Sequence, residues 1–143
     1  MFNSRKRINI NSVKINDRSF ESLGLFLDED YIFNIPPLVK EYEEIPVPGM
    51  NGSYTKFIRY GNREFDIEFQ LKESRDYHNK LFFIQDVLDA GGIITLNNEE
   101  YGYKLKRYSI DNQSRGIGSN AITIHFICMP FIHKKDGTEI KNR

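Results

Sequence analysis

The stretch from residue 63 to residue 96 constrains the fold more than any other part of the sequence. Residues 63–71 alternate strictly between apolar and polar, which is typical of a β-strand with one buried and one wet face. From 74 to 90 the apolar period becomes that of a helix, and 93–96 is a short apolar run typical of a buried strand. The remaining segments are typical of strands and turns, so we expect a β-rich domain with one α-helix on or beside its sheet.

The predicted helix has one apolar stripe and two aromatic residues outside it. The stripe consists of Tyr77, Leu81, Ile84 and Leu88, with Val87 at its edge. Ser74 is a candidate N-cap, and Gly91-Gly92 supplies the left-handed residue that ends many helices. Phe82 and Phe83 lie off the stripe. An aromatic side chain on a wet face lowers solubility unless something covers it, so either a second layer of the domain or a neighbouring subunit covers these two.

Length and charge exclude several classes of protein. The chain has 143 residues, enough for one domain with a real core, and its 20 basic and 20 acidic residues cancel. Tight nucleic-acid binding needs surplus Lys and Arg, so a neutral chain is a poor candidate for it. Net neutrality instead favours association between copies. The single cysteine, Cys128, excludes an internal disulfide.

Neither end of the sequence predicts a membrane or secretory role. Basic residues at Arg5, Lys6 and Arg7 are not followed by an apolar stretch, so we expect no signal peptide. The longest apolar runs are far shorter than a bilayer-spanning segment, so we expect no membrane insertion.

A segment rich in proline and glycine lies between two predicted strands. It reads Ile45, Pro46, Val47, Pro48, Gly49, Met50, Asn51, Gly52 and Ser53. Two prolines remove two backbone donors, so the segment cannot be an interior strand, and its glycines allow a sharp turn. It is either a simple connection or a projecting loop that contacts a partner.

The other strands are predicted from short alternating runs. We expect a hairpin of 7–10 with 13–15, a strand interrupted by one glycine at 23–27, strands at 38–45, 54–60 and 101–110, a loop at 114–120, and a strand at 121–129 that Pro130 ends. The last strand has apolar residues on one face and a mixed second face, which predicts a central position. We therefore expect one domain over 1–131 and a polar, flexible tail over 132–143.

No arrangement of residues predicts catalysis. His78, His125 and His133 have no metal-site spacing, and Cys128 alternates with core residues as a buried thiol does. We therefore expect no catalytic, cofactor-binding or metal-binding residues, and an enzyme is the least favoured class. Tyr101 and Tyr103 on a basic strand could stack on a ligand, although a solvated sheet face is the simpler interpretation.

Several of these features, taken in order, resemble the N-terminal domain of the distal tail protein (Dit) family of long-tailed siphoviruses. The matching segments cover about residues 13 to 131. They are 13–16, 23–25, the proline-containing strand 35–42, the loop 48–52, the turn 61–63 into the alternating strand, the helix that ends at Gly91-Gly92, and 123–131 with its final Cys128-Met129-Pro130-Phe131.

The resemblance implies a fold, an assembly and a location. It implies a β-sandwich-like tail-tube domain with one helix, of which six copies form a ring around the DNA channel at the virion tail tip, after assembly in the host cytoplasm. The ring would join the tail tube to the host-adsorption apparatus, with the major tail tube protein and the tail-tip or baseplate hub proteins as partners. DNA would pass without specific binding. Many relatives carry a further galectin-like domain, for which this chain is too short.

From these expectations we derive one interface hypothesis and one alternative function. The interface hypothesis assigns subunit contacts to the loop from Ile45 to Ser53, to Phe82 and Phe83, or to both. The alternative is a carbohydrate- or receptor-binding β-domain of the tail tip in which Tyr101 and Tyr103 are stacking platforms.

Overall fold

The computed structural model describes residues 12–28, 31–71, 77–97, 99–116 and 119–140, and it is mostly β with a single helix, as predicted. The elements in chain order are β1 (Val13–Ile15), β2 (Arg18–Ser19), the 3-10 helix η1 (Phe20–Leu23), β3 (Leu25–Phe26), β4 (Lys40–Pro46), β5 (Ser53–Tyr60), β6 (Arg63–Leu71), α1 (Tyr77–Asp89), β7 (Ile93–Leu96), β8 (Tyr101–Gly116), β9 (Ser119–Lys134) and β10 (Glu139–Ile140).

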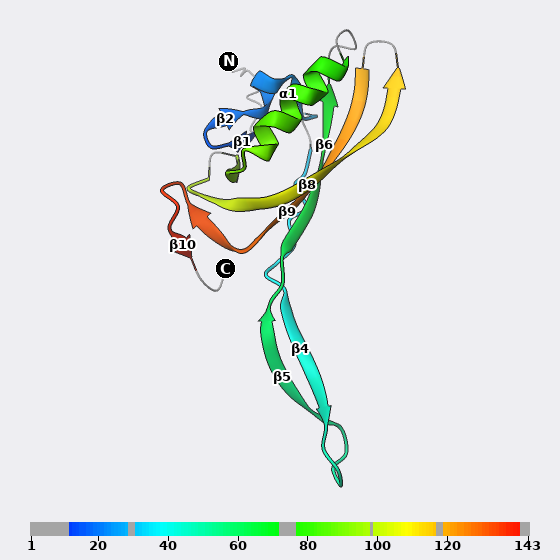
Figure 1. Ribbon diagram of the computed structural model, residues 1–143, viewed down its shortest axis with the longest axis vertical. Helices are drawn as coiled ribbons and strands as arrows, with labels where there is room; N and C mark the ends of the chain where they lie inside the picture. The colour runs from blue at the N-terminus through cyan, green and yellow to red at the C-terminus, as the bar shows by residue number, and fades with distance from the viewer. Residues whose placement is uncertain (1–11, 29–30, 72–76, 98, 117–118, 141–143) are drawn as a thin grey trace, which may run out of the picture.

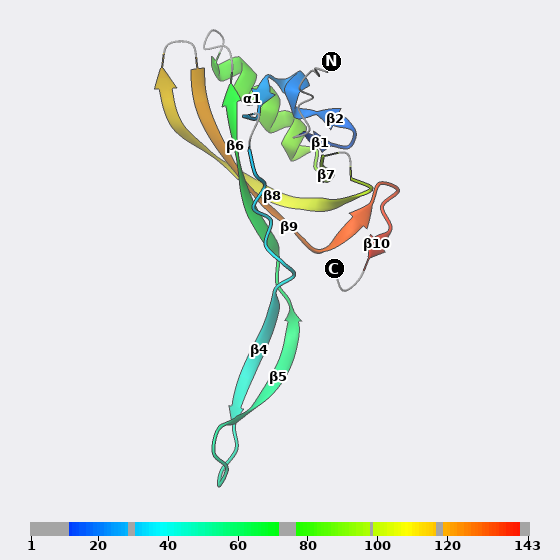
Figure 2. The same cartoon turned by 180° about the vertical axis from the view of Figure 1, so that it is seen from behind.

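Most strands form one curled antiparallel sheet. Its order is β2-β1-β7-β8-β9-β6-β3, with β10 paired to β9. The sheet bends into a half-barrel, α1 lies across it, and β4 and β5 form a separate two-stranded sheet that projects from it (Figure 1). Figure 2 shows the same projection from behind. The domain therefore consists of a body and a projecting hairpin.

The core forms where the alternating strands β6 and β9 lie side by side. They pair antiparallel from Arg63 opposite Cys128 to Leu71 opposite Asn120. The apolar residues predicted for the inner faces are buried: Phe65, Ile67, Phe69 and Leu71 on β6, and Ile122, Ile124, Phe126 and Cys128 on β9. Since β9 runs between β8 and β6, its predicted central position is confirmed.

The helix has the predicted stripe from Leu81 onward and the predicted end, and the side chain of Tyr77 lies outside the described part of the chain. Ile84 and Leu88 are buried, and Leu81 and Val87 pack against the core. The chain leaves the helix through Gly91, whose φ of 76° suits a residue without a side chain. The predicted N-cap, Ser74, lies outside the described residues.

The N-terminal part differs from the prediction. Residues 7–10, proposed as the hairpin partner of β1, lie outside the described residues. Instead β1 pairs with β2 on one side and with β7 on the other. Two positive-φ residues, Asn16 and Asp17, make the turn between β1 and β2. The predicted strand at 23–27 begins as the end of η1 and only Leu25–Phe26 is strand, because Ser19 caps a helical turn there.

The C-terminal part also differs. The predicted loop at 114–120 is largely strand, since β8 continues to Gly116 and β9 begins at Ser119. Pro130 does not end β9, because it lies where the pairing with β8 shifts register, so no ladder hydrogen bond is needed from it. The segment after residue 131, predicted to be a polar tail, contains the end of β9 and β10. His133 in it is buried.

Candidate subunit interface

The projecting hairpin, which we call the arm (residues 39–60), is the first candidate contact surface. Its strands β4 and β5 pair from Lys40 opposite Tyr60 to Pro46 opposite Ser53, with one irregularity next to Tyr42. The predicted loop forms its tip: Ile45 and Pro46 end β4, and the turn runs through Gly49 and Gly52, which have φ of 82° and 84°. The sequence predicted both strands and the turn, but not that they leave the body.

The arm exposes an unusual share of the large hydrophobic side chains. Nine such side chains are exposed in the described part of the chain, and six of them belong to the arm: Val39, Tyr42, Met50, Tyr54, Phe57 and Ile58. Met50 at the tip and Tyr54 beside it are each 60% exposed. A two-stranded hairpin without a covering layer is only marginally stable in water. The arm therefore carries exposed apolar surface that no part of the described chain covers, which makes it a candidate contact surface.

Cross-strand contacts stabilise the arm without burying its side chains. On one face the rings of Tyr42 and Phe57 are 5.8 Å apart, and a row of aromatic rings continues from there through Tyr60 to Phe131 of β9. Nearer the tip, the Glu44 carboxylate accepts hydrogen bonds from the hydroxyls of Ser53 and Thr55. These pairs stabilise a ribbon whose two faces stay open.

A buried arginine fixes the root of the arm. Arg63 is 6% exposed, and its guanidinium donates to the carbonyl oxygens of Pro130, at 3.1 and 3.3 Å, and of Pro36, at 3.3 Å. It also lies 5.4 Å from the ring centre of Tyr103. Pro36 belongs to the segment that leads into β4, and Pro130 belongs to β9, so this side chain connects the segment before the arm to the sheet. The alternating pattern placed Arg63 in β6 but gave no sign of this role.

The second candidate surface lies on α1. Phe82 and Phe83 are 57% and 47% exposed, as their position off the stripe predicted. No layer of the described domain covers them. Arg18 of β2 lies over the Phe83 ring, 5.9 Å from its centre. The helix and the arm tip lie at opposite ends of the molecule, so the structure does not bring the predicted interface residues together (Figures 1 and 2).

The two tyrosines of the alternative function lie in different surroundings. Both line a hollow of about 550 Å³ near the turn between β7 and β8, together with Asn97, Glu99, Glu100 and Ile132. The Tyr103 ring packs edge-on against Phe65 of the core, 5.4 Å away, and burial raises its pKa although Arg63 opposes the shift. Tyr103 therefore packs against the core on one side, although both tyrosines line the hollow and both are half-buried.

Two of the titratable side chains singled out by the sequence, His125 and Cys128, lie in surroundings that change their pKa. His125 on the wet face of β9 lies between two carboxylates of β6, with Nδ1 against Asp66 and Nε2 3.0 Å from Glu64. The hydrogen bond with Asp66 raises the pKa of His125; partial burial opposes this, and Glu64 adds to it. Burial raises the pKa of the Cys128 thiol to about 12, so this cysteine is not a nucleophile at neutral pH.

The described ranges contain neither a candidate metal site nor a candidate membrane-spanning helix. No group of three or more His, Cys, Asp and Glu side chains there is arranged to hold a metal ion. Within the same ranges, α1 is too short and too polar to cross a bilayer.

Comparison with known proteins gives one informative similarity. No family model and no curated protein matches the chain. Among solved structures, the chain is similar to the Dit protein (gp 19.1) of SPP1, described as a paradigm of the hub adsorption apparatus in phages that infect Gram-positive bacteria, with a TM-score of 0.58 and 14% identity. The match covers 87% of this chain and 52% of that one, so the chain spans about half the length of its match. The chain thus has the fold found in a siphovirus distal tail protein, which confirms at the level of the fold the resemblance that its sequence suggested.

Proposed function

We propose that this protein is a structural, non-catalytic component of a phage tail tip, whose copies associate into a hexameric ring around the DNA channel. The ring joins the tail tube to the host-adsorption apparatus, with the major tail tube protein above it and hub proteins below. DNA passes through without specific binding. The fold shared with SPP1 Dit supports the location, and the surfaces of this chain support the association.

The arm is the observation that carries the proposal. None of its residues belongs to the hydrophobic core, which is formed by residues of the body. It nevertheless exposes six large hydrophobic side chains and extends away from the sheet. In a monomer this projection leaves its apolar side chains in water, whereas in a ring it can bury them against the next subunit.

An incompletely paired strand edge is a second feature suited to assembly. β6 pairs with β9 over its whole length, but on its other edge β3 pairs only with Gln70 and Leu71. The hydroxyl of Tyr31 accepts a hydrogen bond from the Glu68 backbone N–H and donates one to the Asp66 carbonyl oxygen at 3.5 Å, so the chain itself satisfies this part of the edge. Open edges are where copies of β proteins pair, so the rest of this edge is a further candidate contact.

The proposal is tested by the state of the purified chain. Multi-angle light scattering and negative-stain electron microscopy should show six-membered rings at high concentration. Phe82→Asp should weaken the rings in sedimentation, whereas Asn79→Asp, which adds the same single charge at an exposed position about one turn before it on the same helix, is the matched control. Monomers at every concentration that bind to a glycan array would contradict the ring and favour the receptor-binding function.

A further inference from the structure

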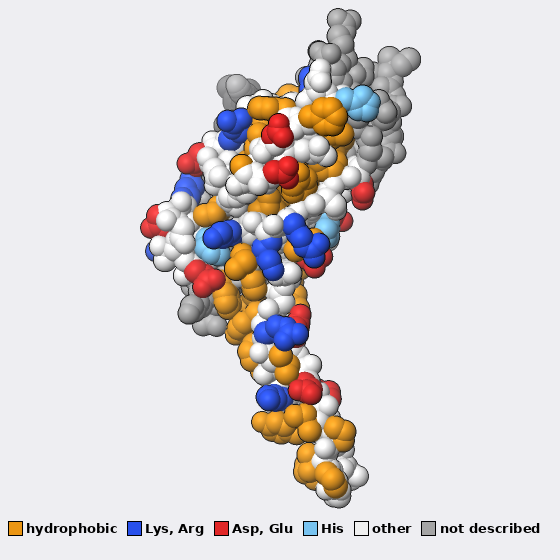
Figure 3. Space-filling view, in the orientation of Figure 1, with side chains coloured by type: hydrophobic (Ala, Val, Ile, Leu, Met, Phe, Trp, Pro, Cys, Tyr) orange, Lys and Arg blue, Asp and Glu red, His pale blue; other side chains and the backbone are white. Residues whose placement is uncertain are grey.

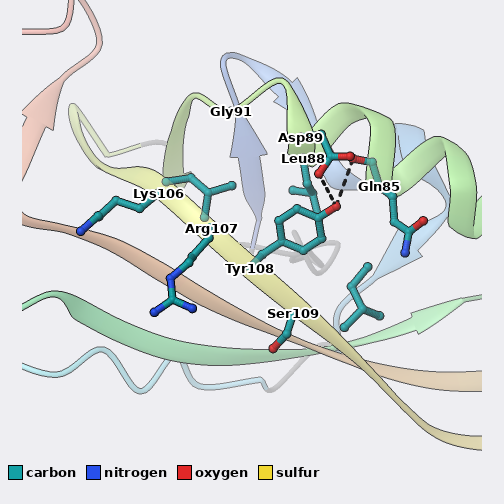
Figure 4. A pocket seen from close by; sticks show the side chains of 10 residues that line it. Gln85, Leu88, Asp89, Gly91, Lys106, Arg107, Tyr108 and Ser109 are labelled. Carbon is teal, nitrogen blue, oxygen red and sulfur yellow. Dashed lines mark hydrogen bonds between the residues drawn. The ribbon is translucent and has the colours of Figure 1, made fainter.

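A groove lies between the second half of α1 and β8. Its volume is about 470 Å³, and its walls come from the helix end and from residues 105–110 of β8. The Tyr108 hydroxyl bridges the two walls: it lies 2.7 Å from Oδ1 of Asp89 and 3.2 Å from the Gln85 carbonyl oxygen. Figure 4 shows Tyr108 pointing to the helix, with Lys106 and Arg107 directed away from it. The groove is thus a fixed feature of the body.

The two sides of this groove carry opposite charges. Asp89 lines the helix side, with Asp86 exposed one turn before it on the same helix, and the exposed Lys106 and Arg107 line the strand side. Asp89 accepts a hydrogen bond from the Tyr108 hydroxyl, and the Lys106 Nζ donates one to Asn62 at 2.9 Å. The apolar residues Leu88, Leu105 and Ile110 lie between them. On the face in Figure 3, acidic side chains lie over α1, basic side chains lie over the strands below it, and hydrophobic surface separates them. A ligand that fits this groove has a cationic edge, an anionic edge and apolar groups.

One face of the arm has this pattern. Alternation along β4 places Glu41 and Glu43 on that face, and they lie opposite Arg59 and Lys56 of β5. The Arg59 Nε is 2.9 Å from Oε1 of Glu41, and all four side chains are exposed. Farther along the same face toward the tip, the cross-strand pair is Ile45 with Tyr54. The arm thus offers an acidic strand beside a basic strand, followed by apolar residues.

We propose that the groove between α1 and β8 receives the arm of a second copy, with β4 over Lys106 and Arg107 and β5 over Asp86 and Asp89. The inference rests on the proposed function, because it names the partner surface of the arm. The arm extends away from the groove of its own chain (Figures 1 and 2), so the contact joins two chains. A contact between two different surfaces is head-to-tail, and such contacts close into a ring when the rotation between neighbouring copies divides a full turn.

The acidic side of the groove favours the arm of a second copy over a polyanion as the ligand. Lys106 and Arg107 alone would suit a nucleic acid, but Asp89 on the opposite wall, with Asp86 exposed one turn before it on the helix, would repel its phosphates. A segment with both charges in two rows is attracted by both walls. Because the charges are exposed, the association should weaken as salt shortens the Debye length.

Charge reversal in the full chain tests the pairing. Arg107→Glu and Glu43→Lys should each raise the dissociation constant of the assembly by about tenfold, since each replaces an attraction with a repulsion. The double variant should restore association to near the wild-type value. Lys135→Glu, an equal charge change in the exposed turn before β10, is the control and should have little effect. Reversals that act no more strongly than Lys135→Glu, or a double variant without rescue, would overturn the inference.

Cross-linking separates a failure of this inference from a failure of the proposed function. Chains with Glu43→Cys and Arg107→Cys, mixed and oxidised, should give a disulfide-linked dimer, and Glu43→Cys with Lys135→Cys should not. The native Cys128 is fully buried and does not compete. If the wild-type chain assembles but the first pair does not cross-link, the ring stands and the groove contact is wrong. A wild-type chain that stays monomeric at all concentrations in low salt, with no cross-link, overturns both.

Discussion

Removing the charge of Arg63 should destabilise the protein measurably, because this side chain connects the approach of the arm to β9. The test substitution is Arg63→Met, which keeps an unbranched stem of similar length. It removes three hydrogen bonds from the guanidinium, to the carbonyl oxygens of Pro130 and Pro36. It also removes the interaction with the Tyr103 ring, 5.4 Å away.

The expected magnitude follows from what remains after the substitution. Each partly buried carbonyl left without a donor costs about 1 kcal/mol, because the bonds are at the long end of the normal range. The lost cation–π contact adds roughly 0.5–1 kcal/mol. A guanidinium that no longer has to be desolvated offsets part of this loss. The net cost is about 2 kcal/mol, which lowers the melting temperature of a domain of this size by roughly 4–8 °C.

Urea denaturation and differential scanning calorimetry of the two proteins measure this difference. Arg59→Met is the matched control: it makes the same chemical change on the arm, where the Arg59 side chain is 69% exposed in its ion pair with Glu41. Exposed pairs contribute little, so this variant should stay within about 0.5 kcal/mol of the wild type. If Arg63→Met proves as stable as Arg59→Met, Arg63 does not fasten the arm in the way the hydrogen bonds suggest.

Three further predictions concern the body. The pKa of His125 in the folded protein lies above its ordinary 6.5, so its contribution to the free energy of unfolding is fully present below pH 6.5 and is lost as the pH rises through the folded pKa. Urea titrations at several pH values should show that His125→Gln removes this loss of stability. An unchanged dependence of stability on pH would contradict the role of Asp66 and Glu64. Cys128 should react with a thiol reagent only in denaturant, since burial raises its pKa to about 12; labelling of the native protein at the unfolded rate would be inconsistent with a buried thiol. Phe69→Ala should cost about 3–5 kcal/mol in chemical denaturation, because its buried ring stacks on Phe20 at 5.2 Å, and a loss below about 1 kcal/mol would show that the core collapses into the cavity.

Much of the body could be predicted because its signals are local. The alternation in 63–71 and the stripe on α1 each depend only on residues within one element, and both are correct in the structure. The same applies to the inner face of β9. The change of face in β8 near Arg107 comes from the register shifts on both sides of Leu105.

Other features depend on contacts between distant residues. Pro130 was expected to end a strand, but a register shift between β8 and β9 accommodates it, and neither strand alone shows that shift. The side chain of Asn16 links the β1–β2 turn to the chain after α1, since it donates to the Gly91 carbonyl and accepts from the Ile93 N–H. No local pattern predicts such a contact across more than seventy residues.

The arm, which is the main part of the candidate site, was also only partly predictable from the sequence. The sequence predicted the strands and the proline-rich turn between 45 and 53, yet a strand's alternation does not say whether a second sheet lies over it. Here both faces of the ribbon carry apolar and charged residues, because neither packs on the body. The exposure of Phe82 and Phe83 was predictable because a helical wheel separates them from the stripe. Their contact with another subunit remains a prediction.

Deletion of the arm gives the most direct test of whether this segment serves other copies rather than its own fold. The N–H of Gly61 donates to the carbonyl of Val39 at 2.9 Å, so the two ends meet and a short glycine linker can replace residues 40–60. Sedimentation velocity and electron microscopy of both proteins at equal concentration provide the measurement. The account predicts rings from the wild type and folded monomers with an unchanged melting temperature from the deletion. Rings of normal size from the armless protein would contradict it.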